Sequence, residues 1–262
     1  MRKIFYIFLS VFCFYFSAQA EAPQEKITIV ADTWCPYNCN PKSPHQGFMV
    51  DIAKAAFAKH NIAVEYVVEP WTQAIKDTQK GKYNAVIGAS TGDAPDFVFP
   101  SITQGFLQNH FYVKKDGEWK YTDIKSLNGV ILGVIADYSY NDEMDAYIKK
   151  YRLDPEKISI ISGDKALGIN LSKMLRGKIG ATLESKFVME YYLSQNNMVG
   201  QVQEAGALPP SDKDKLYIAF SPKDRKLAEK YAEILSAETK NMRESGELAK
   251  ILDIYGLADW EK

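Results

Sequence analysis

Cys35 and Cys39, near the start of the chain, have a spacing that could support covalent or metal chemistry. With His45 close behind, a C-x-x-x-C pair could contribute to a metal site. A closed zinc site takes four ligands, however, and the sequence has only 3 histidines and no second cysteine pair. In an oxidising compartment two such cysteines pair with each other by default. The sequence therefore favours a Cys35–Cys39 disulfide, with a metal site as the alternative.

Aromatic and acidic residues follow the ends of several expected strands. Ring faces and carboxylates together suit a cationic or amine-bearing ligand, because both attract positive charge. The alternative is that some of these aromatics fill the cores of the fold and that Asp93 and Asp96 only brace a turn. The candidates are the aromatics Trp34, Tyr37, Trp71, Tyr138 and Tyr140 and the acids Asp93, Asp96 and Glu184.

No catalytic motif accompanies these residues. The sequence has no G-x-S-x-G elbow, no phosphate-binding loop and no H-E-x-x-H zinc motif. The cysteine spacing is not the C-x-x-C of redox enzymes. We therefore expect a binding protein with no catalytic residue, no cofactor and no metal. An acid–base enzyme that uses Glu184 is the alternative.

Residues 1–20 have the features of a cleavable signal peptide. A basic start precedes an apolar run and an A-x-A cleavage pattern. The apolar run is short for a membrane span, which leaves a retained anchor as the alternative. A lipoprotein is disfavoured because bulky Phe12 precedes Cys13, where a small residue is required. We expect a mature chain that begins near Glu21 and is located in the periplasm.

The charge balance argues against a polyanionic partner. The chain has 32 Lys and Arg against 33 Asp and Glu, and the two signs are interspersed. Nucleic-acid-binding proteins concentrate basic residues on one surface, so we expect no nucleic-acid partner. A mature length of about 240 residues is enough for one large or two modest cores.

Hydrophobic periodicity divides the mature chain into two similar runs of alternating strands and helices. Each has the order strand, helix, strand, helix, strand, which indicates a lobe built on a mostly parallel sheet. The tail is expected to be helical, with Gly256 as its C-cap. The first run has strands at 26–31, 62–68 and 84–88 with helices starting near Phe48 and Trp71; the second has strands at 130–136, 158–161 and 179–183 with helices over 141–151, after a cap at Asp164, and through 191–193.

Two extended segments, 106–113 and 216–221, are expected to cross between the lobes and form a hinge. The predicted fold is therefore α/β and two-lobed, with two crossover strands. The expected divisions are a signal peptide at 1–20, the first part of lobe 1 at 25–107, lobe 2 at 108–216, and a return to lobe 1 with C-terminal helices at 217–262.

Ligands of parallel α/β sheets bind beyond the carboxyl ends of the strands. In the first run these ends are 31–37 and 88–96. In the second run they are 136–140 and Glu184. All of the candidate aromatics and acids except Trp71 fall in these segments, which favours a single site between the lobes.

Short motifs follow one another through the mature chain: W-C-P-Y at 34–37, G-F-M-V-D-I at 47–52, P-W at 70–71, G-K-Y-N-A-V-I-G at 81–88, S-L at 126–127, G-V at 133–134, G-K-I-G-A at 177–181, Y-I-A-F at 217–220 and R-E-S-G at 243–246. In this order they resemble the periplasmic solute-binding proteins of the polar amino acid type, extracellular solute-binding protein family 3. The resemblance implies two α/β lobes, capture of a solute between them, and delivery to an ABC-type permease in the inner membrane. We expect the protein to be a monomer.

The resemblance also implies roles for particular residues. Trp34 and Trp71 match two aromatics that contact the ligand. Residues 88–91 match a strand end that offers carbonyls and a hydroxyl to an α-ammonium, and Glu184 matches the acid that pairs with it, one methylene longer than the usual Asp. The expected ligand-binding residues are Trp34, Tyr37, Trp71, Gly88, Ala89, Ser90, Thr91, Asp96, Tyr138, Ser139, Tyr140 and Glu184.

One position departs from the pattern of the family. Members that bind α-amino acids have an Arg a few residues after the Thr, and here Pro95 or Asp96 falls at that position. A carboxylate cannot replace the paired donors of a guanidinium and repels a ligand carboxylate. Either another cation serves or the ligand has no such carboxylate, and we favour a small polar solute that is cationic or carries an amine. The alternatives are a solute sensor without an importer and a dehydratase-like enzyme on the same fold.

Overall fold

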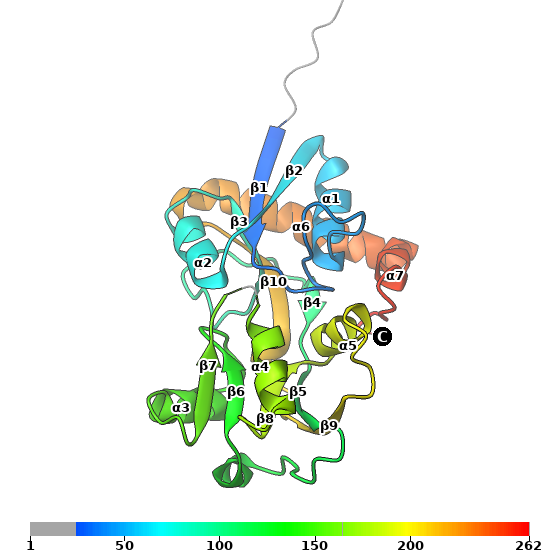
Figure 1. The fold of residues 1–262 in the computed structure, drawn as a ribbon. Coiled ribbons are helices and arrows are strands. Elements are labelled where there is room, and N and C mark those ends of the chain that lie inside the picture. Colours follow the sequence, from blue (N-terminus) through cyan, green and yellow to red (C-terminus); the bar gives the residue numbers. More distant parts are fainter. Residues whose placement is uncertain (1–24, 164, 262) are drawn as a thin grey trace, which may run out of the picture.

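The computed structural model describes residues 25–163 and 165–261, which form two α/β lobes connected by crossing segments (Figure 1). The predictions of a signal peptide at 1–20 and of a helix cap at Asp164 lie outside the described residues. Among the described helices, none is long and apolar enough to cross a membrane.

Lobe 1 is built on a five-stranded sheet in the order β2-β1-β3-β10-β4. Strands β1, β2 and β3 are parallel because helices connect them, whereas β10 is antiparallel to both β3 and β4. Its strands are β1 (Glu25–Ala31), β2 (Ile62–Val68), β3 (Ala85–Ala89), β4 (Gly105–Phe106) and β10 (Lys215–Phe220), and its helices are α1 (Phe48–Ala58), α2 (Trp71–Gln79), α6 (Arg225–Ser245) and α7 (Glu247–Asp253).

Lobe 2 repeats this plan with the order β7-β6-β8-β5-β9. Strands β6, β7 and β8 are parallel, and β5 is antiparallel to β8 and β9. Asn141 begins α3 as predicted, because its side chain accepts a hydrogen bond from the backbone N–H of Met144 at 2.8 Å. The strands are β5 (Asn109–Lys114), β6 (Leu132–Ile135), β7 (Ile158–Ile161), β8 (Ala181–Ser185) and β9 (Val202–Ala207), and the helices are α3 (Asp142–Tyr151), α4 (Ala166–Leu175) and α5 (Lys186–Gln195).

The predicted α/β two-lobed fold is confirmed, with three local corrections. Both sheets are mixed rather than mostly parallel, because β10 and β5 enter from the other lobe and pair antiparallel. Strand β9 was not predicted. Helix α7 ends at Asp253, and Gly256, with a φ of 68°, lies in the turn that follows.

Two segments cross between the sheets and lie against each other. Residues 107–108 connect β4 to β5, and residues 208–214 connect β9 to β10, upstream of the predicted second crossover. The backbone N–H of Leu107 donates to the carbonyl of Asp214 at 2.7 Å, and that of Leu208 donates to the carbonyl of Asn109 at 2.9 Å. These hydrogen bonds join the two crossing segments into one hinge element.

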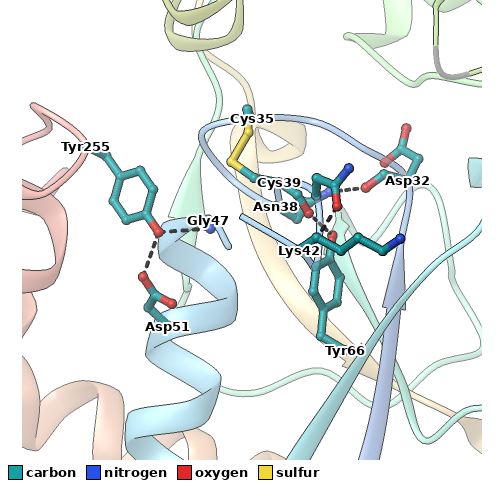
Figure 2. The surroundings of a disulfide bond; sticks show 10 residues. Asp32, Cys35, Asn38, Cys39, Lys42, Gly47, Asp51, Tyr66 and Tyr255 are labelled. Carbon is teal, nitrogen blue, oxygen red and sulfur yellow. Dashed lines mark hydrogen bonds between the residues drawn. A yellow bond between two sulfur atoms is a disulfide. The ribbon is translucent and has the colours of Figure 1, made fainter. Parts of the chain in front are cut away.

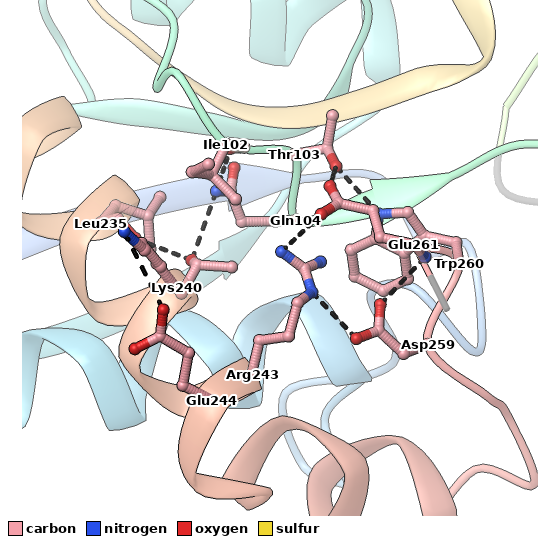
Figure 3. Close-up of polar contacts among 11 residues, drawn as sticks. Ile102, Thr103, Gln104, Leu235, Lys240, Arg243, Glu244, Asp259, Trp260 and Glu261 are labelled. Atoms are coloured by element: carbon pink, nitrogen blue, oxygen red, sulfur yellow. Dashed lines mark hydrogen bonds and ion pairs between the residues drawn. The ribbon is translucent and has the colours of Figure 1, made fainter.

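The C-terminal residues fold back onto lobe 1 through a compact polar cluster (Figure 3). Arg243 of α6 contacts Asp259 and Glu261, each at 2.9 Å, and its guanidinium lies 5.5 Å from the ring centre of Trp260. The indole N–H of Trp260 donates to the hydroxyl of Thr103 at 2.9 Å. Because Thr103 lies two residues before β4, this cluster fixes the chain close to the hinge.

The main buried apolar cluster continues across the boundary between the lobes. It contains Phe48 of lobe 1 and Met189 of lobe 2, both almost fully buried. Trp34 and Tyr37, two of the predicted ligand-binding residues, belong to the same cluster. The core therefore extends up to the predicted site.

Candidate functional site

Two spaces lie between the lobes and share one wall. The inner cavity, of about 30 Å³, reaches the crossing segment at Leu107, and the outer cleft, of about 480 Å³, extends over α5. Since a water molecule needs roughly 10–15 Å³ by this measure, the inner cavity has room for very few waters. The outer cleft is within the range of organic-ligand sites, roughly 300–1,000 Å³. The shared wall consists of Asp32, Trp34, Trp71, Tyr138 and Glu184.

Glu184 is a buried carboxylate at the centre of this wall. It lies near the end of β8, its residue is 3% exposed, and its Oε1 accepts hydrogen bonds from Trp34 Nε1 at 3.3 Å and from the backbone N–H of Ser185 at 2.8 Å. Among the described residues, none donates a hydrogen bond to Oε2. Burial raises the pKa of Glu184 from its ordinary value of 4.5 to about 7; the two hydrogen bonds lower it and the charge of Asp32 raises it. The two hydrogen bonds therefore compensate the negative charge of the side chain only in part.

Trp34 and Tyr37 form an aromatic pair on the lobe 1 side. Their rings stack with centres 4.2 Å apart and an angle of 14° between the planes. Trp34 lines both spaces, whereas Tyr37 is fully buried, and its hydroxyl donates to the carbonyl of Phe106 at 2.8 Å and lies 3.2 Å from the hydroxyl of Ser185. Tyr37 thus supports Trp34 and connects the lobes at the hinge without lining either space.

A disulfide closes the loop that positions these two rings (Figure 2). Cys35 and Cys39 are paired with their Cα atoms 4.6 Å apart, which confirms the predicted disulfide. The side-chain amide of Asn38 donates to the carbonyl of Asp32 at 2.7 Å, and the hydroxyl of Tyr66 donates to the carbonyl of Cys39 at 2.9 Å. The loop is therefore held at both ends and in the middle.

The loop after β6 supplies the lobe 2 side of the wall. The hydroxyl of Tyr138 donates to Asp32 Oδ2 at 2.9 Å, and its ring meets Trp34 edge-on at 6.0 Å. Ser139 and Tyr140 line the inner cavity behind it. Tyr138 therefore joins the lobes at a point where it lines both spaces.

The segment after β3 is brought to the site only in part. Gly88 lines the inner cavity, whereas Ala89, Ser90 and Thr91 line neither space. The backbone N–H and the hydroxyl of Ser90 donate to Asp93 Oδ2 at 2.8 and 2.6 Å, and this turn directs Asp93 to the inner cavity.

Asp96 also lies outside both spaces. Its side chain is exposed and accepts a hydrogen bond from Gln79 of α2 at 3.3 Å. The position at which the sequence resemblance implied an Arg is therefore at the surface in this structure.

Several lining residues were not on the predicted list. Asp32 is the first residue after β1 and lay inside a predicted strand-end segment, so that rule could have selected it. Asn109, Leu107 and Leu216 line the inner cavity from the crossing strands, and no sequence signal marked them. The side-chain nitrogen of Asn109 is buried and, among the described residues, has no hydrogen-bond acceptor. The inner cavity thus contains a polar donor as well as carboxylates.

The charge of the two spaces is of one sign. Asp32, Asp93 and Glu184 line the inner cavity, and Asp32 and Glu184 also line the outer cleft. Among the described residues that line either space, none is Lys or Arg. Across the described part of the chain there is no group of three or more His, Cys, Asp or Glu residues placed to hold a metal ion. The site is therefore suited to a positively charged organic group, which the aromatic rings also attract.

Two α/β lobes, a paired crossing segment and a site between the lobes are the features of a solute-binding protein fold. The chain belongs to the bacterial extracellular solute-binding proteins, family 3, whose sequence model matches residues 27–258. This membership confirms the resemblance inferred from the ordered motifs. It assigns the chain to a family of solute-binding proteins.

Individual relatives agree with this assignment. An octopine-binding periplasmic protein of Rhizobium meliloti is 25% identical over 190 residues, a match that covers 70% of this chain but only 57% of the relative. A solved ancestral arginine-binding protein bound to glutamine has a TM-score of 0.69 at 18% identity, covering 88% of this chain and 97% of that one. A histidine kinase sensor domain with similarity to periplasmic binding proteins has a TM-score of 0.71 at 13% identity, covering 89% and 97%. At these identities the solved structures establish the fold alone.

Proposed function

We propose that this protein is a secreted periplasmic receptor that captures a small cationic or amine-bearing solute between its lobes. Closure at the hinge encloses the solute, and the closed form delivers it to an ABC-type importer in the inner membrane. The observation that carries the proposal is the lining of the site, in which carboxylates and aromatic rings occur without Lys or Arg among the described residues.

The head group of the solute pairs with Glu184. Oε2 of this carboxylate has no hydrogen-bond donor among the described residues, and burial has raised the pKa of Glu184 to about 7. A buried charge without a partner is costly, so a cation that reaches Oε2 gains a charge-assisted hydrogen bond and removes that cost. Asp32 adds negative charge from lobe 1, and Trp34 offers a ring face.

Closure depends on contacts that exist only when the lobes meet. Three hydrogen-bonded side-chain pairs join one lobe to the other: Trp34 with Glu184, Tyr37 with Ser185, and Tyr138 with Asp32. A cation bound between Asp32 and Glu184 adds attraction across the same boundary. A ligand that interacts with both lobes therefore favours the closed state over the open one.

Matched pairs of amines and amino acids test the proposal. Agmatine and arginine, tyramine and tyrosine, and cadaverine and lysine differ within each pair only by the α-carboxylate. We expect the amine of at least one pair to raise the melting temperature of the oxidised protein. At a hundred times its dissociation constant, the amine should increase the free energy of unfolding by about 2.7 kcal/mol. Equal or greater stabilisation by the amino acids would overturn the assignment of a carboxylate-free cation.

Uptake by cells separates import from sensing. A strain that lacks this protein should recover accumulation of the radiolabelled amine when the protein is restored. A receptor that only reports the solute to a signalling partner would bind the amine with the same affinity but leave accumulation unchanged. The similarity in fold to a histidine kinase sensor domain makes sensing the second candidate function.

A further inference from the structure

The outer cleft is much larger than the head group that Glu184 can bind. A primary ammonium is about the size of a water molecule, whose share of liquid volume is roughly 30 Å³. The outer cleft has a volume of about 480 Å³, and its carboxylates, Asp32 and Glu184, both belong to the wall that it shares with the inner cavity. A ligand that consisted of the head group alone would leave most of the cleft filled with solvent.

Among the described residues, the part of the cleft away from this wall carries no charged side chain, and α5 forms one side of it. Tyr191, Tyr192 and Gln195 line it from the second half of that helix, Asn196 lines it from the C-cap, and Thr72 lines it from the start of α2. These side chains offer aromatic faces, hydroxyls and amides, and the described lining residues outside the shared wall include no ionisable acid or base other than these tyrosines and the disulfide-bonded Cys35. The far part of the cleft therefore suits a neutral body that combines apolar surface with hydrogen-bonding groups.

Two of these residues are exposed and available for contact with a ligand. Tyr191 is 37% exposed, although it is a large aromatic residue, and Gln195 is exposed one helical turn further on. Their spacing of four residues places them on the same face of α5. Tyr192 is more constrained, since a Cβ on Gly168 would lie only 2.4 Å from its hydroxyl oxygen.

We propose that the natural ligand is an elongated amine with two parts: a cationic head at Glu184 and Asp32, and an uncharged, carboxylate-free body that extends along α5. Tyr191 and Gln195 are the residues that select this body. The inference rests on the proposed function, because it takes the head-group site as given and assigns the rest of the molecule. Free amino acids, with a carboxylate beside the ammonium, fit neither part.

Calorimetry with a graded series of amines tests the proposal. Ethylamine, hexylamine, phenethylamine and tyramine share one head group and differ in the size and polarity of the body. We expect the best longer amine to bind at least about tenfold more tightly than ethylamine, because its body displaces solvent from the cleft. We expect Tyr191→Ala and Gln195→Ala to lower the affinity for that amine by about threefold or more. The same variants should change the affinity for ethylamine by less than about twofold.

The control and a head-group variant keep the outcomes distinct. Glu190→Ala changes an exposed residue of the same helix that does not line the cleft, and should leave all four affinities unchanged. Glu184→Gln should abolish binding of every member of the series. If all four amines bind equally, or if the α5 variants weaken all of them equally, the elongated ligand is ruled out while the cationic head remains. If none binds, the proposed function itself fails.

Discussion

Two clusters in this molecule combine acidic side chains with a tryptophan, one at the C terminus and one between the lobes. In the C-terminal cluster the chain supplies its own cation: Arg243 contacts Asp259 at 2.9 Å, and its guanidinium lies over Trp260 (Figure 3). Asp259 is 5% exposed and Arg243 is 14% exposed, so the charges are largely withdrawn from water but are paired. Folding therefore pairs Nε and Nη1 of Arg243 with acidic side chains of the same chain.

Between the lobes, Glu184 has no such partner among the described residues. Its residue is 3% exposed, its Oε1 accepts hydrogen bonds from Trp34 and a backbone N–H, and none of the described lining residues is Lys or Arg. The comparison indicates that the chain can bury a carboxylate with its partner when only structure is required. Where the partner is left out, the folded protein retains a charge that a ligand can compensate.

Glu184→Gln is expected to have the largest effect on binding. Removal of one member of a buried charge pair costs roughly 2–5 kcal/mol, so the affinity for the amine should fall by about a hundredfold or more. Near pH 7 the empty variant should melt at a higher temperature than the unchanged protein, because it no longer carries a buried carboxyl whose ionisation favours the unfolded chain, and its amide oxygen can still accept a hydrogen bond from Trp34. Titration calorimetry of this variant beside Glu190→Gln, an exposed position on α5, measures the effect. An affinity close to that of the unchanged protein would mean that the ligand does not contact Glu184.

Arg243→Met should show the opposite pattern. Loss of the guanidinium leaves Asp259 buried without its cation, and we expect the free energy of unfolding to fall by about 3 kcal/mol. Affinity for the amine should stay the same, since the cluster lies outside both interlobe spaces. Lys240→Met is the matched control on α6: its contact with Glu244 is 3.9 Å long and exposed, so the change should be about 0.5 kcal/mol or less. Loss of binding in Arg243→Met would show that the C-terminal cluster controls closure as well as stability.

The sequence predicted the positions of the strands better than it predicted which distant residues those strands contact. Periodicity located the strands near whose carboxyl ends Asp32, Gly88 and Glu184 lie, because a buried strand is marked by its own residues. It did not reveal that Asn109 lines the inner cavity, since the neighbours of that residue come from distant parts of the chain. Strand β9 was missed for a similar reason: it forms at a sheet edge through pairing with β5.

Residues that share a segment did not share a role. Trp34 and Tyr37 were both expected to contact the ligand, but a disulfide-closed loop turns one ring toward the spaces and the other into the core. Asp93 and Asp96 lie three residues apart, yet Ser90 holds the first toward the inner cavity and Gln79 binds the second at the surface. Side-chain direction inside a loop depends on tertiary contacts, which spacing does not encode.

The pH dependence of stability tests the burial of Glu184. The pKa of Glu184 in the folded protein, about 7, is above its ordinary value of 4.5, so folding favours the protonated form. The contribution of this group to stability is complete below pH 4.5 and is lost as the pH rises to 7, because only the unfolded chain ionises in that window. We expect a loss of roughly 2–3 kcal/mol in urea unfolding of the empty protein. Glu184→Gln should lack this loss, whereas an identical pH profile in both proteins would assign the effect to another group.

Paired replacement of Cys35 and Cys39 by serine should have a smaller effect on stability. Opening so short a loop costs about 2 kcal/mol in the chain-entropy model. Because the loop positions Trp34, its added freedom must be removed again on binding, and we expect affinity for the amine to fall by about threefold to tenfold. Reduction of the unchanged protein should reproduce both effects. Lower stability with unchanged affinity would show that Asn38 and Tyr66 hold the loop without the disulfide.

Asp96→Asn is expected to have the smallest effect of all, although the sequence placed Asp96 at a decisive position. Its carboxylate is exposed and bonded to Gln79, outside both interlobe spaces, and exposed substitutions of this kind usually change binding by less than about twofold. Asp32→Asn is the informative comparison, because Asp32 lines both spaces. This substitution should lower the affinity for the amine by at least about tenfold. If Asp96→Asn instead produced the larger loss, the charge that selects the ligand would be located at the end of β3 and not on the shared wall.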